Sequence, residues 1–221
     1  MDAAGIRSKF SVERAHKTQF EDRLPKKIRY VAGVDVAYTK NFSIGVVAVL
    51  NYASLEPVES QKTIYKTYFP YIPTLLSFRE IPPTVFSVKK LHVQPDVFLV
   101  DGHGFAHPYR CGFATHLGLV MGKPTIGVAK SKLLSEVENV KSEEDTVFLK
   151  HKGEIIGASV TTKHGSKPVY VSVGHMISLK RAIQIVKHCT CNNRIPEPIL
   201  KAHEIATAEK RKINNASTTN N

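Results

Sequence analysis

The run DVFLVD at residues 96–101 constrains the fold more than any other part of the chain. Its four central residues are all apolar and stand between two aspartates. A strand with one side in water alternates polar and apolar residues, so an unbroken apolar run indicates a strand buried on both faces. Such strands lie at the centre of sheets that carry helices on both sides. The run therefore predicts an α/β fold in which Asp101 ends a central strand.

The segments around this run give the predicted order of elements. Strand-like segments at 30–38, 44–52 and 60–69 follow one another at hairpin spacing, which predicts antiparallel pairing. A helical pattern over 74–92 is interrupted by Pro82-Pro83, so we expect one helix to end near Glu80 and another to begin at Pro83. The remaining predictions are an N-terminal helix closed by Pro25, helices at 113–121, 178–190 and 197–212, and strands at 124–129, 146–150, 154–163 and 168–173.

The chain shows no internal repeat and no linker, which predicts one domain over residues 1–212. Residues 213–221 are polar and are expected to form a disordered tail. The sequence has no run long enough to span a membrane and no secretory h-region near its start. Its three cysteines cannot all pair. We therefore expect a cytoplasmic monomer that makes no contact with membranes.

Charge points to the class of partner. The 31 Lys and Arg residues outnumber the 19 Asp and Glu residues, which gives a formal net charge of +12. A strongly basic chain favours polyanionic partners, and no segment reads as a basic amphipathic surface helix. Nucleic acid is therefore the predicted partner, with general solubility charge as the plainer interpretation.

Acidic residues stand at positions where they are costly to place. Asp35 interrupts the apolar strand VAGVDVAY, and a buried acid there needs a partner or a metal ion. Asp101 lies at the strand edge where ligands bind in open α/β sheets. Glu80, on the intervening helix, supplies a third carboxylate. If Asp35, Glu80 and Asp101 converge, they form an oxygen-only site for Mg²⁺ or Mn²⁺; the alternative is a hydrogen-bonded core aspartate at position 35.

The stretch DGHGFAHPYRCGFATHLG at 101–118 admits two interpretations. His103, His107, Cys111 and His116 are close enough in sequence to suggest zinc, although glycines and a proline break any helix that would align them. Alternatively, Gly102 and Gly104 allow a backbone to approach a ligand closely. His107 and His116 then contact phosphates or bases, or are ordinary core histidines.

Two further motifs bear on nucleic acid. In FPYIPTLLSFRE, the segment Pro70-Tyr71-Ile72-Pro73 is expected to be stiff and extended, because prolines fix φ and restrict the residue before them. Lys130 follows a short strand in GVAKSKL, where a cation beside the acids suits a scissile phosphate. The alternatives are a packed loop aromatic for Tyr71 and an exposed surface cation for Lys130.

Six motifs occur in one order along nearly the whole chain. They are YVAGVDVAY, FPYIPTLLSFRE, PDVFLVDGHGFAHPYRCGFATHLGL, GKPTIGVAKSKL, PVYVSVGH and RIPEPILKAHE. Together they resemble endonuclease V, a family of nucleases that act on deaminated adenine (hypoxanthine). The resemblance implies a ribonuclease-H-like fold with a mixed central sheet flanked by helices on both faces.

The resemblance also implies residue roles. Asp35, Glu80 and Asp101 match the family's Mg²⁺ site, where Mn²⁺ is an expected substitute, and His203 matches the position that completes it. Lys130 matches the phosphate-side lysine. Tyr71, held by Pro70, Ile72 and Pro73, matches the wedge that enters the duplex. The pocket for the flipped base matches Leu76, Gly102, Gly104 and Phe113.

The implied reaction is hydrolysis of the second phosphodiester bond 3′ to hypoxanthine in DNA, leaving 3′-hydroxyl and 5′-phosphate ends. Three alternatives remain: an endoribonuclease that cuts single-stranded RNA at inosine, a catalytically inert lesion-binding protein, and a zinc-stabilised nucleic-acid binder. Two residues depart from the family pattern near the pocket. His103 stands where relatives often carry Asn or Gln, and Thr74 stands where they often carry glycine.

Overall fold

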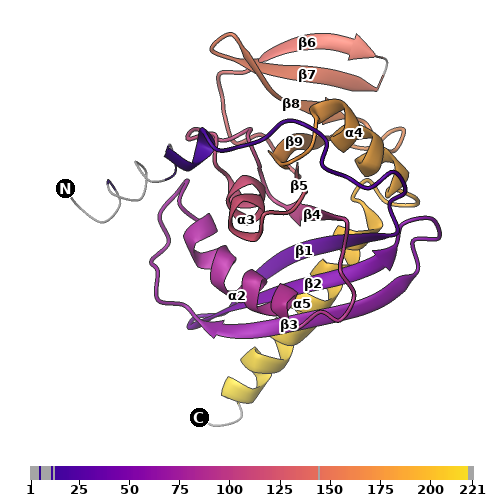
Figure 1. Ribbon diagram of the computed structural model, residues 1–221. Coiled ribbons are helices and arrows are strands. Elements are labelled where there is room, and N and C mark those ends of the chain that lie inside the picture. The colour runs from indigo at the N-terminus through magenta and orange to yellow at the C-terminus, as the bar shows by residue number, and fades with distance from the viewer. Residues whose placement is uncertain (1–4, 6–10, 12, 144, 219–221) are drawn as a thin grey trace.

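A single mixed sheet organises the molecule. The computed structural model describes residues 5, 11, 13–143 and 145–218. Within these residues the sheet has nine strands in the order β3-β2-β1-β4-β5-β9-β8-β7-β6 (Figure 1). The strands are β1 (Tyr30–Tyr38), β2 (Phe42–Asn51), β3 (Pro57–Lys66), β4 (Val97–Asp101), β5 (Thr125–Ala129), β6 (Glu138–Glu143), β7 (Thr146–His151), β8 (Glu154–Val160) and β9 (Val169–His175).

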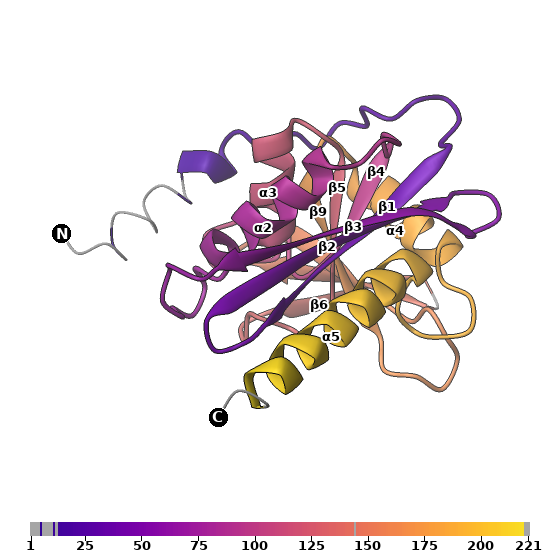
Figure 2. The same ribbon diagram turned by 90° about the horizontal axis from the view of Figure 1, so that it is seen from below.

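Helices cover both faces of the sheet. They are α2 (Ser77–Lys89), α3 (Phe113–Met121), α4 (Leu179–His188) and α5 (Glu197–Thr218). Alternate residues of the central strands face two hydrophobic clusters, one beneath α2 and α3 and the other beneath α4 and α5. Figure 2 shows α2 and α3 on one side of the sheet and α5 on the other. The predicted mixed sheet with helices on both faces is confirmed.

The centre of the sheet is β4, as its apolar run predicts. Val97 to Val100 are 0–1 % exposed. Val97 and Leu99 pack in the cluster under α4 and α5, whereas Phe98 and Val100 pack in the cluster under α2 and α3. Burying side chains of this size contributes about 1.5–3 kcal/mol each. This apolar layer anchors the strand edge at which Asp101 emerges.

Strand pairing brings the acids to one edge. β1 and β4 run parallel, and Val34 pairs with Val100 in their register. The next residue on each strand is therefore an aspartate, Asp35 on β1 and Asp101 on β4. β5 also runs parallel to β4, so Lys130, just beyond its end, reaches the same edge.

The predicted helix break at Pro82-Pro83 is wrong. α2 is continuous from Ser77 to Lys89 although both prolines lie inside it. The prolines remove two backbone donors. Tertiary packing holds the helix in place, and the Ser87 hydroxyl donates to the Gly45 carbonyl of β2 at 2.8 Å. The helix thus runs unbroken from the site to the far end of the sheet.

The ends of the chain also differ from the predictions. At the N-terminus, residues 11 and 13–15 are helical, and residues 18–29 run without a helix; the rest of the predicted N-terminal helix lies partly outside the described residues. At the C-terminus, α5 continues to Thr218, so residues 213–218 are helical where a disordered tail was expected. Ile213 packs against the core and extends the apolar stripe of the helix. The hairpin strand β6 was not predicted, because ENVKSE lacks β-formers apart from Val140.

The position of α5 depends on Gly33. A Cβ atom at Gly33 would lie 1.8 Å from the Pro198 carbonyl oxygen, which belongs to the first turn of α5. Only glycine lets β1 and α5 approach this closely. Since α5 carries His203, the glycine sets the distance between that histidine and Asp35.

We predict that Gly33→Ala destabilises the protein by about 3 kcal/mol or more, because backbone must move to admit the methyl group. In a chain of this size the melting temperature falls by about 10 °C. Gly122→Ala is the matched control. Gly122 has a φ of +61° but open space around it, so alanine there meets only backbone strain, about 1–2 kcal/mol. Equal losses in both variants, measured by thermal unfolding, would contradict the close-packing role of Gly33.

Candidate active site

Asp35, Asp101 and His203 come together at the carboxyl edge of the sheet. One ligand atom of each lies within 4.8 Å of the others. The Asp35 Oδ2 and His203 Nδ1 atoms are 2.7 Å apart. Asp35 comes from β1, Asp101 from β4 and His203 from α5, so three elements of the core fix the group. Two carboxylates and an imidazole are a donor set suited to a divalent cation.

Lys130 contributes positive charge to this edge. Its Nζ donates to Asp101 Oδ2 at 2.6 Å, and its side chain is 43 % exposed. Burial raises the pKa of Asp101, and the neighbouring Asp35 charge raises it further, whereas Lys130 lowers it. The ammonium group therefore touches the acids on one side and solvent on the other, where an anion has access.

Glu80 is a buried carboxyl beside the cluster. It lies in the first turn of α2 and is 8 % exposed. Burial raises its pKa to about 8, and the charges of Asp35 and Asp101 contribute to the increase. The neighbouring Tyr38 phenol and Arg79 guanidinium act against this increase and lower the pKa of Glu80 in part. The surrounding protein therefore balances the charge of these carboxyls only in part, and a cation would favour their charged forms.

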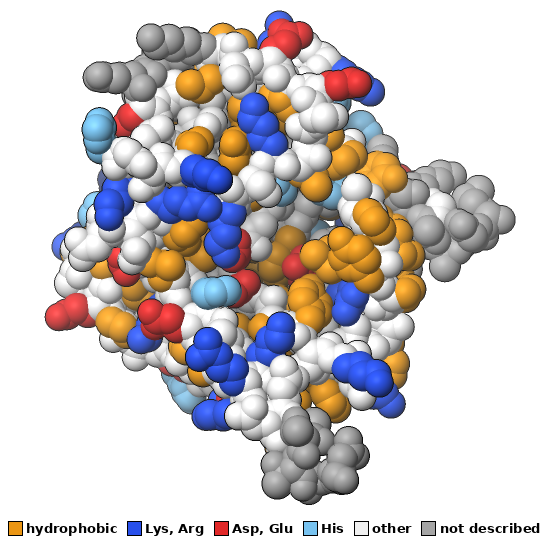
Figure 3. All heavy atoms as spheres, turned by 180° about the vertical axis from the view of Figure 1, so that it is seen from behind, with side chains coloured by type: hydrophobic (Ala, Val, Ile, Leu, Met, Phe, Trp, Pro, Cys, Tyr) orange, Lys and Arg blue, Asp and Glu red, His pale blue; other side chains and the backbone are white. Residues whose placement is uncertain are grey.

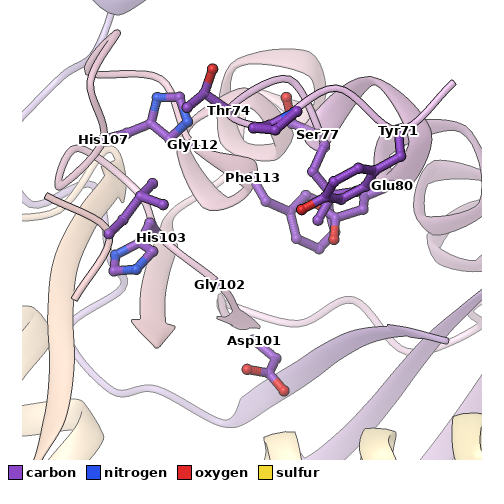
Figure 4. Close-up of a pocket in the computed structure, with 13 residues that line it drawn as sticks. Tyr71, Thr74, Ser77, Glu80, Asp101, Gly102, His103, His107, Gly112 and Phe113 are labelled. Carbon is purple, nitrogen blue, oxygen red and sulfur yellow. The ribbon is translucent and has the colours of Figure 1, made fainter. Parts of the chain in front are cut away.

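A cavity opens beside the acids. It has a volume of about 270 Å³ and is bounded by α2, the loop after β4 and the start of α3. Figure 4 shows Asp101 and Gly102 on one side, Phe113 and Ser77 across from them, and Tyr71 at the edge. Tyr71 is 67 % exposed, which leaves its ring projecting at the rim. A cavity of this depth with mainly apolar walls can enclose a flat aromatic group.

A groove of about 570 Å³ lies on the other side of the acids. It runs from Asp35 and Asp101 past Lys130 and along α5, where Lys210 and Arg211 line it. Figure 3 shows this hollowed face, with acidic and histidine side chains at the bottom, Lys and Arg on one flank and hydrophobic side chains on the other. The arrangement suits a phosphate backbone that crosses the acids.

The predicted substrate-binding residues, which include the wedge segment and the pocket, separate into two groups. Tyr71, Pro73, Leu76, Gly102, His107 and Phe113 line the cavity. Pro70, Ile72, Gly104 and His116 do not. Gly104 packs against β9, where a Cβ would lie 2.2 Å from the Val173 carbonyl oxygen. Its predicted ligand contact is therefore replaced by a backbone contact.

His107 and His116 are both buried, and burial lowers the pKa of His107 to about 4 and that of His116 to about 3. His116 contacts the Ser77 hydroxyl at 3.1 Å and is a core histidine. His107 accepts from the Tyr109 backbone N–H and bonds the backbone of Thr74. Thr74 has a φ of +69°, a conformation that glycine adopts freely and threonine rarely. His107 therefore helps to hold this strained loop.

The zinc alternative is wrong for the described residues. Among them, the one group of three or more metal-ligating side chains within reach of each other is Asp35, Asp101 and His203. Cys111 is buried, and burial raises its pKa to about 11, which disfavours the thiolate that zinc requires.

None of the helices in the described part of the chain has the length and apolar character needed to cross a bilayer.

Several site residues were not predicted. Leu133 and Ser77 line the cavity, and Tyr38, Lys210 and Arg211 line the groove. The run AEKRK at 208–212 carries a signal for the last two, because it places positive charge on the helix that holds His203. Leu133 comes from an irregular loop and gives no sequence signal.

Known proteins match the chain over most of its length. The model of the family described as endonuclease V matches residues 12–204. Endonuclease V from Thermofilum pendens is 45 % identical over 211 residues, covering 91 % of this chain and 90 % of the relative. The crystal structure of endonuclease V from Streptomyces avermitilis is 32 % identical, with a TM-score of 0.86 and coverage of 98 % of this chain and 95 % of that one.

A further solved structure carries nucleic acid. Endonuclease V from Ciona intestinalis, in complex with a 24mer DNA containing an inosine followed by a ribo-adenosine, is 33 % identical, with a TM-score of 0.86. The match covers 95 % of this chain and 98 % of that chain. The expected ribonuclease-H-like fold is thus shared with these solved structures.

The raised pKa of Glu80 predicts how stability depends on pH. The pKa of about 8 in the folded protein exceeds the ordinary pKa of 4.5. The contribution of Glu80 to the stability of the metal-free protein is therefore fully present below pH 4.5 and is lost as the pH rises through 8. In Glu80→Gln the side chain cannot ionise, so this loss of stability does not occur. We expect the variant to match the wild type at about pH 4.5 and to melt roughly 5 °C or more higher at about pH 9. Adding Mg²⁺ should narrow the difference.

Glu59→Gln is the control with the opposite sign. Hydrogen bonds from Gln61 and from the Val93 and His92 backbone lower the pKa of Glu59 to about 2. That contribution is present above the ordinary value and is lost only as pH falls through 2, so the variant should melt lower than the wild type at alkaline pH. If Glu80→Gln also melts lower at alkaline pH, Glu80 does not carry uncompensated charge.

Proposed function

The chain belongs to the endonuclease V family of nucleases, and we propose that it cuts DNA beside hypoxanthine, the deamination product of adenine. The observation that carries this proposal is the junction of two features. A base-sized cavity and a cluster of acids share Asp101 and Glu80 as common walls. A base held in the cavity therefore brings the backbone of its own strand to the acids.

Extrusion of the base is the first requirement. A base inside a duplex cannot be examined, and flipping it costs a few kcal/mol. The exposed Tyr71 ring stands at the cavity rim on a loop that contains Pro70 and Pro73. A ring fixed in this way fills the gap in the base stack with little loss of side-chain entropy, and stacking contributes about 1–3 kcal/mol per base.

Recognition follows from the polar groups of the cavity. Hypoxanthine differs from adenine by a 6-oxo group and an N1–H donor. Gly102 lets the backbone approach the base, and the buried Nδ1 atom of His103 has no hydrogen-bond partner among the described residues. Burial lowers the pKa of His103, which keeps the ring neutral and able to accept from N1–H. Adenine would leave such groups unpaired, at about 1–3 kcal/mol each.

The acids are proposed to hold Mg²⁺, with Mn²⁺ as a substitute. The donors of Asp35, Asp101 and His203 fit such an ion. Glu80 lies beside them, and a bound cation would favour its charged form. When bound, the ion neutralises charge on the phosphodiester and makes an attacking water more acidic. Lys130 faces both Asp101 and the groove, where it can contact a non-bridging phosphate oxygen.

The proposed cut is at the second phosphodiester bond 3′ to the lesion and leaves 3′-hydroxyl and 5′-phosphate ends. This position rests on the family resemblance. One observation is consistent with it: Asp101 lines both the cavity and the groove along α5, so the backbone next to a flipped nucleotide can cross the acids.

RNA cut at inosine is the second candidate. The Ciona intestinalis relative is in complex with DNA in which a ribo-adenosine follows inosine. A 2′-hydroxyl next to the lesion is therefore compatible with that complex. Parallel cleavage assays on matched DNA and RNA strands that contain one hypoxanthine decide between the substrates.

We predict that Asp35→Asn and Asp101→Asn each reduce nicking of a hypoxanthine duplex by more than about 100-fold, because losing even a residue that only orients a metal's ligands lowers activity about 10–100-fold. The assay compares this duplex with an otherwise identical adenine duplex, in Mg²⁺. Asp145→Asn is the matched control, since Asp145 pairs with Lys187 away from the site. Full activity in either cluster variant would remove the metal assignment.

Tyr71→Ala tests the wedge. We expect the affinity for a hypoxanthine duplex to fall by about ten-fold or more, the size of a lost stacking contact. Mn²⁺ binding, followed by calorimetry, should be unchanged, because Tyr71 is outside the cluster of Asp35, Asp101 and His203. Unchanged affinity for the duplex would rule out the wedge.

A further inference from the structure

A second hollow lies next to the first turns of α2. It has a volume of about 220 Å³ and is lined mainly by four aromatic rings together with an arginine and a proline: Tyr65, Tyr68, Phe69, Phe78, Arg79 and Pro82. None of these residues belongs to the base cavity or to the groove along α5. The site described above therefore leaves this hollow without a role.

Helical spacing sets the two hollows on opposite sides of α2. Leu76, Ser77 and Glu80 line the base cavity. Phe78, Arg79 and Pro82 line the second hollow. Each residue of the second set follows one of the first by two positions, which on a helix of 3.6 residues per turn is a rotation of about 200°.

The loop before the helix is divided in the same way. Phe69 lines the second hollow, whereas Tyr71, Pro73 and Thr74 line the base cavity. The proposed wedge, Tyr71, lines the base cavity and follows Phe69 by two residues, so this short segment joins the two hollows. Whatever enters the second hollow therefore lies next to the segment that carries the wedge.

The lining suits a nucleobase and its phosphate. Tyr68 is 73 % exposed, and its ring meets the Tyr65 ring edge-on at 6.0 Å between centroids. The Lys66 ammonium lies 5.7 Å from the centre of the Tyr68 ring. Exposed aromatic rings with adjacent cations form stacking platforms for unpaired bases.

Arg79 adds a half-buried cation whose charge also lowers the pKa of Glu80. Its Nε atom has no hydrogen-bond partner, and Arg79 forms no ion pair within the described part of the chain. The guanidinium is held over the Tyr38 ring at 4.7 Å. A guanidinium fixed in this way, with its donors unused, is suited to a phosphate.

We propose that this hollow binds the orphan base, the base of the complementary strand that loses its partner when the lesion is extruded. The proposal rests on the proposed function. Flipping one base leaves one other base unpaired, and the lesion strand is already engaged by the base cavity and the acids. The orphan base then stacks on Tyr68 and Tyr65 while Arg79 contacts its phosphate, so both halves of the broken pair are held.

The test compares a hypoxanthine duplex with the lesion strand alone. We expect Tyr68→Ala to lower kcat/KM for nicking the duplex by about ten-fold or more, and to change it by about two-fold at most for the single strand, which has no orphan base. Tyr68→Phe keeps the ring and should retain both activities. Ile155→Ala is the control: it truncates an exposed apolar side chain elsewhere, on β8, and should leave the activity on both substrates unchanged.

A second readout does not depend on cutting. The fluorescent base 2-aminopurine is placed opposite the lesion, and fluorescence anisotropy shows when the duplex is fully bound. In the wild-type complex the probe should stack on the aromatic rings, so its emission should stay quenched. Tyr68→Ala should release that emission, and Tyr68→Phe should not. Equal emission from the wild type and Tyr68→Ala would overturn the proposal.

The kinetic results distinguish failure of the orphan-base site from failure of the proposed nuclease activity. A wild type that nicks neither substrate contradicts the proposed function itself. If the wild type nicks both the duplex and the single strand, the proposed nuclease activity stands. If Tyr68→Ala then lowers kcat/KM equally for the two substrates, or for neither of them, the orphan-base site is ruled out. An equal loss on both substrates would assign the hollow to the lesion strand.

Discussion

The structure depends on negative charge that is concentrated at one edge of a sheet. Asp35, Glu80 and Asp101 are held close enough to raise the pKa of Glu80 and that of Asp101, and Lys130 and His203 only partly offset the carboxyls. Like charges in a poorly solvated place are unstable unless a cation joins them. Folding leaves the charge at this edge incompletely balanced, which suits the edge to a cation.

The core provides the rigidity that such a site requires. The apolar layers on both faces of β4 fix the strand that carries Asp101, and the parallel register with β1 brings Asp35 beside it. Close contact at Gly33 fixes α5, and with it His203. Catalytic groups need placement to within about 0.5 Å. Substitutions far from the acids are thus expected to act on the site through these contacts.

Local patterns predicted the parts of the fold that depend on local signals. The apolar run at 96–101 identified the central strand, and Asp35 stood out because a charge interrupts a buried strand. Tertiary contacts decided what the sequence could not. Pro82-Pro83 marks a break by propensity, yet packing on β2 keeps α2 continuous. Gly104 suggested ligand approach, but the close neighbour is β9. The second aromatic hollow joins β3 to α2, so no single motif showed it.

The acids lie between the base cavity and the basic groove of α5, an arrangement that suits a duplex opened at the lesion. The proposed cleavage depends on a divalent cation at the acids. The most direct measurement is anomalous scattering from a crystal soaked in Mn²⁺. We predict a peak bounded by the carboxylates of Asp35 and Asp101 and the imidazole of His203. A fully occupied Mn²⁺ peak elsewhere, with none at this edge, would contradict it.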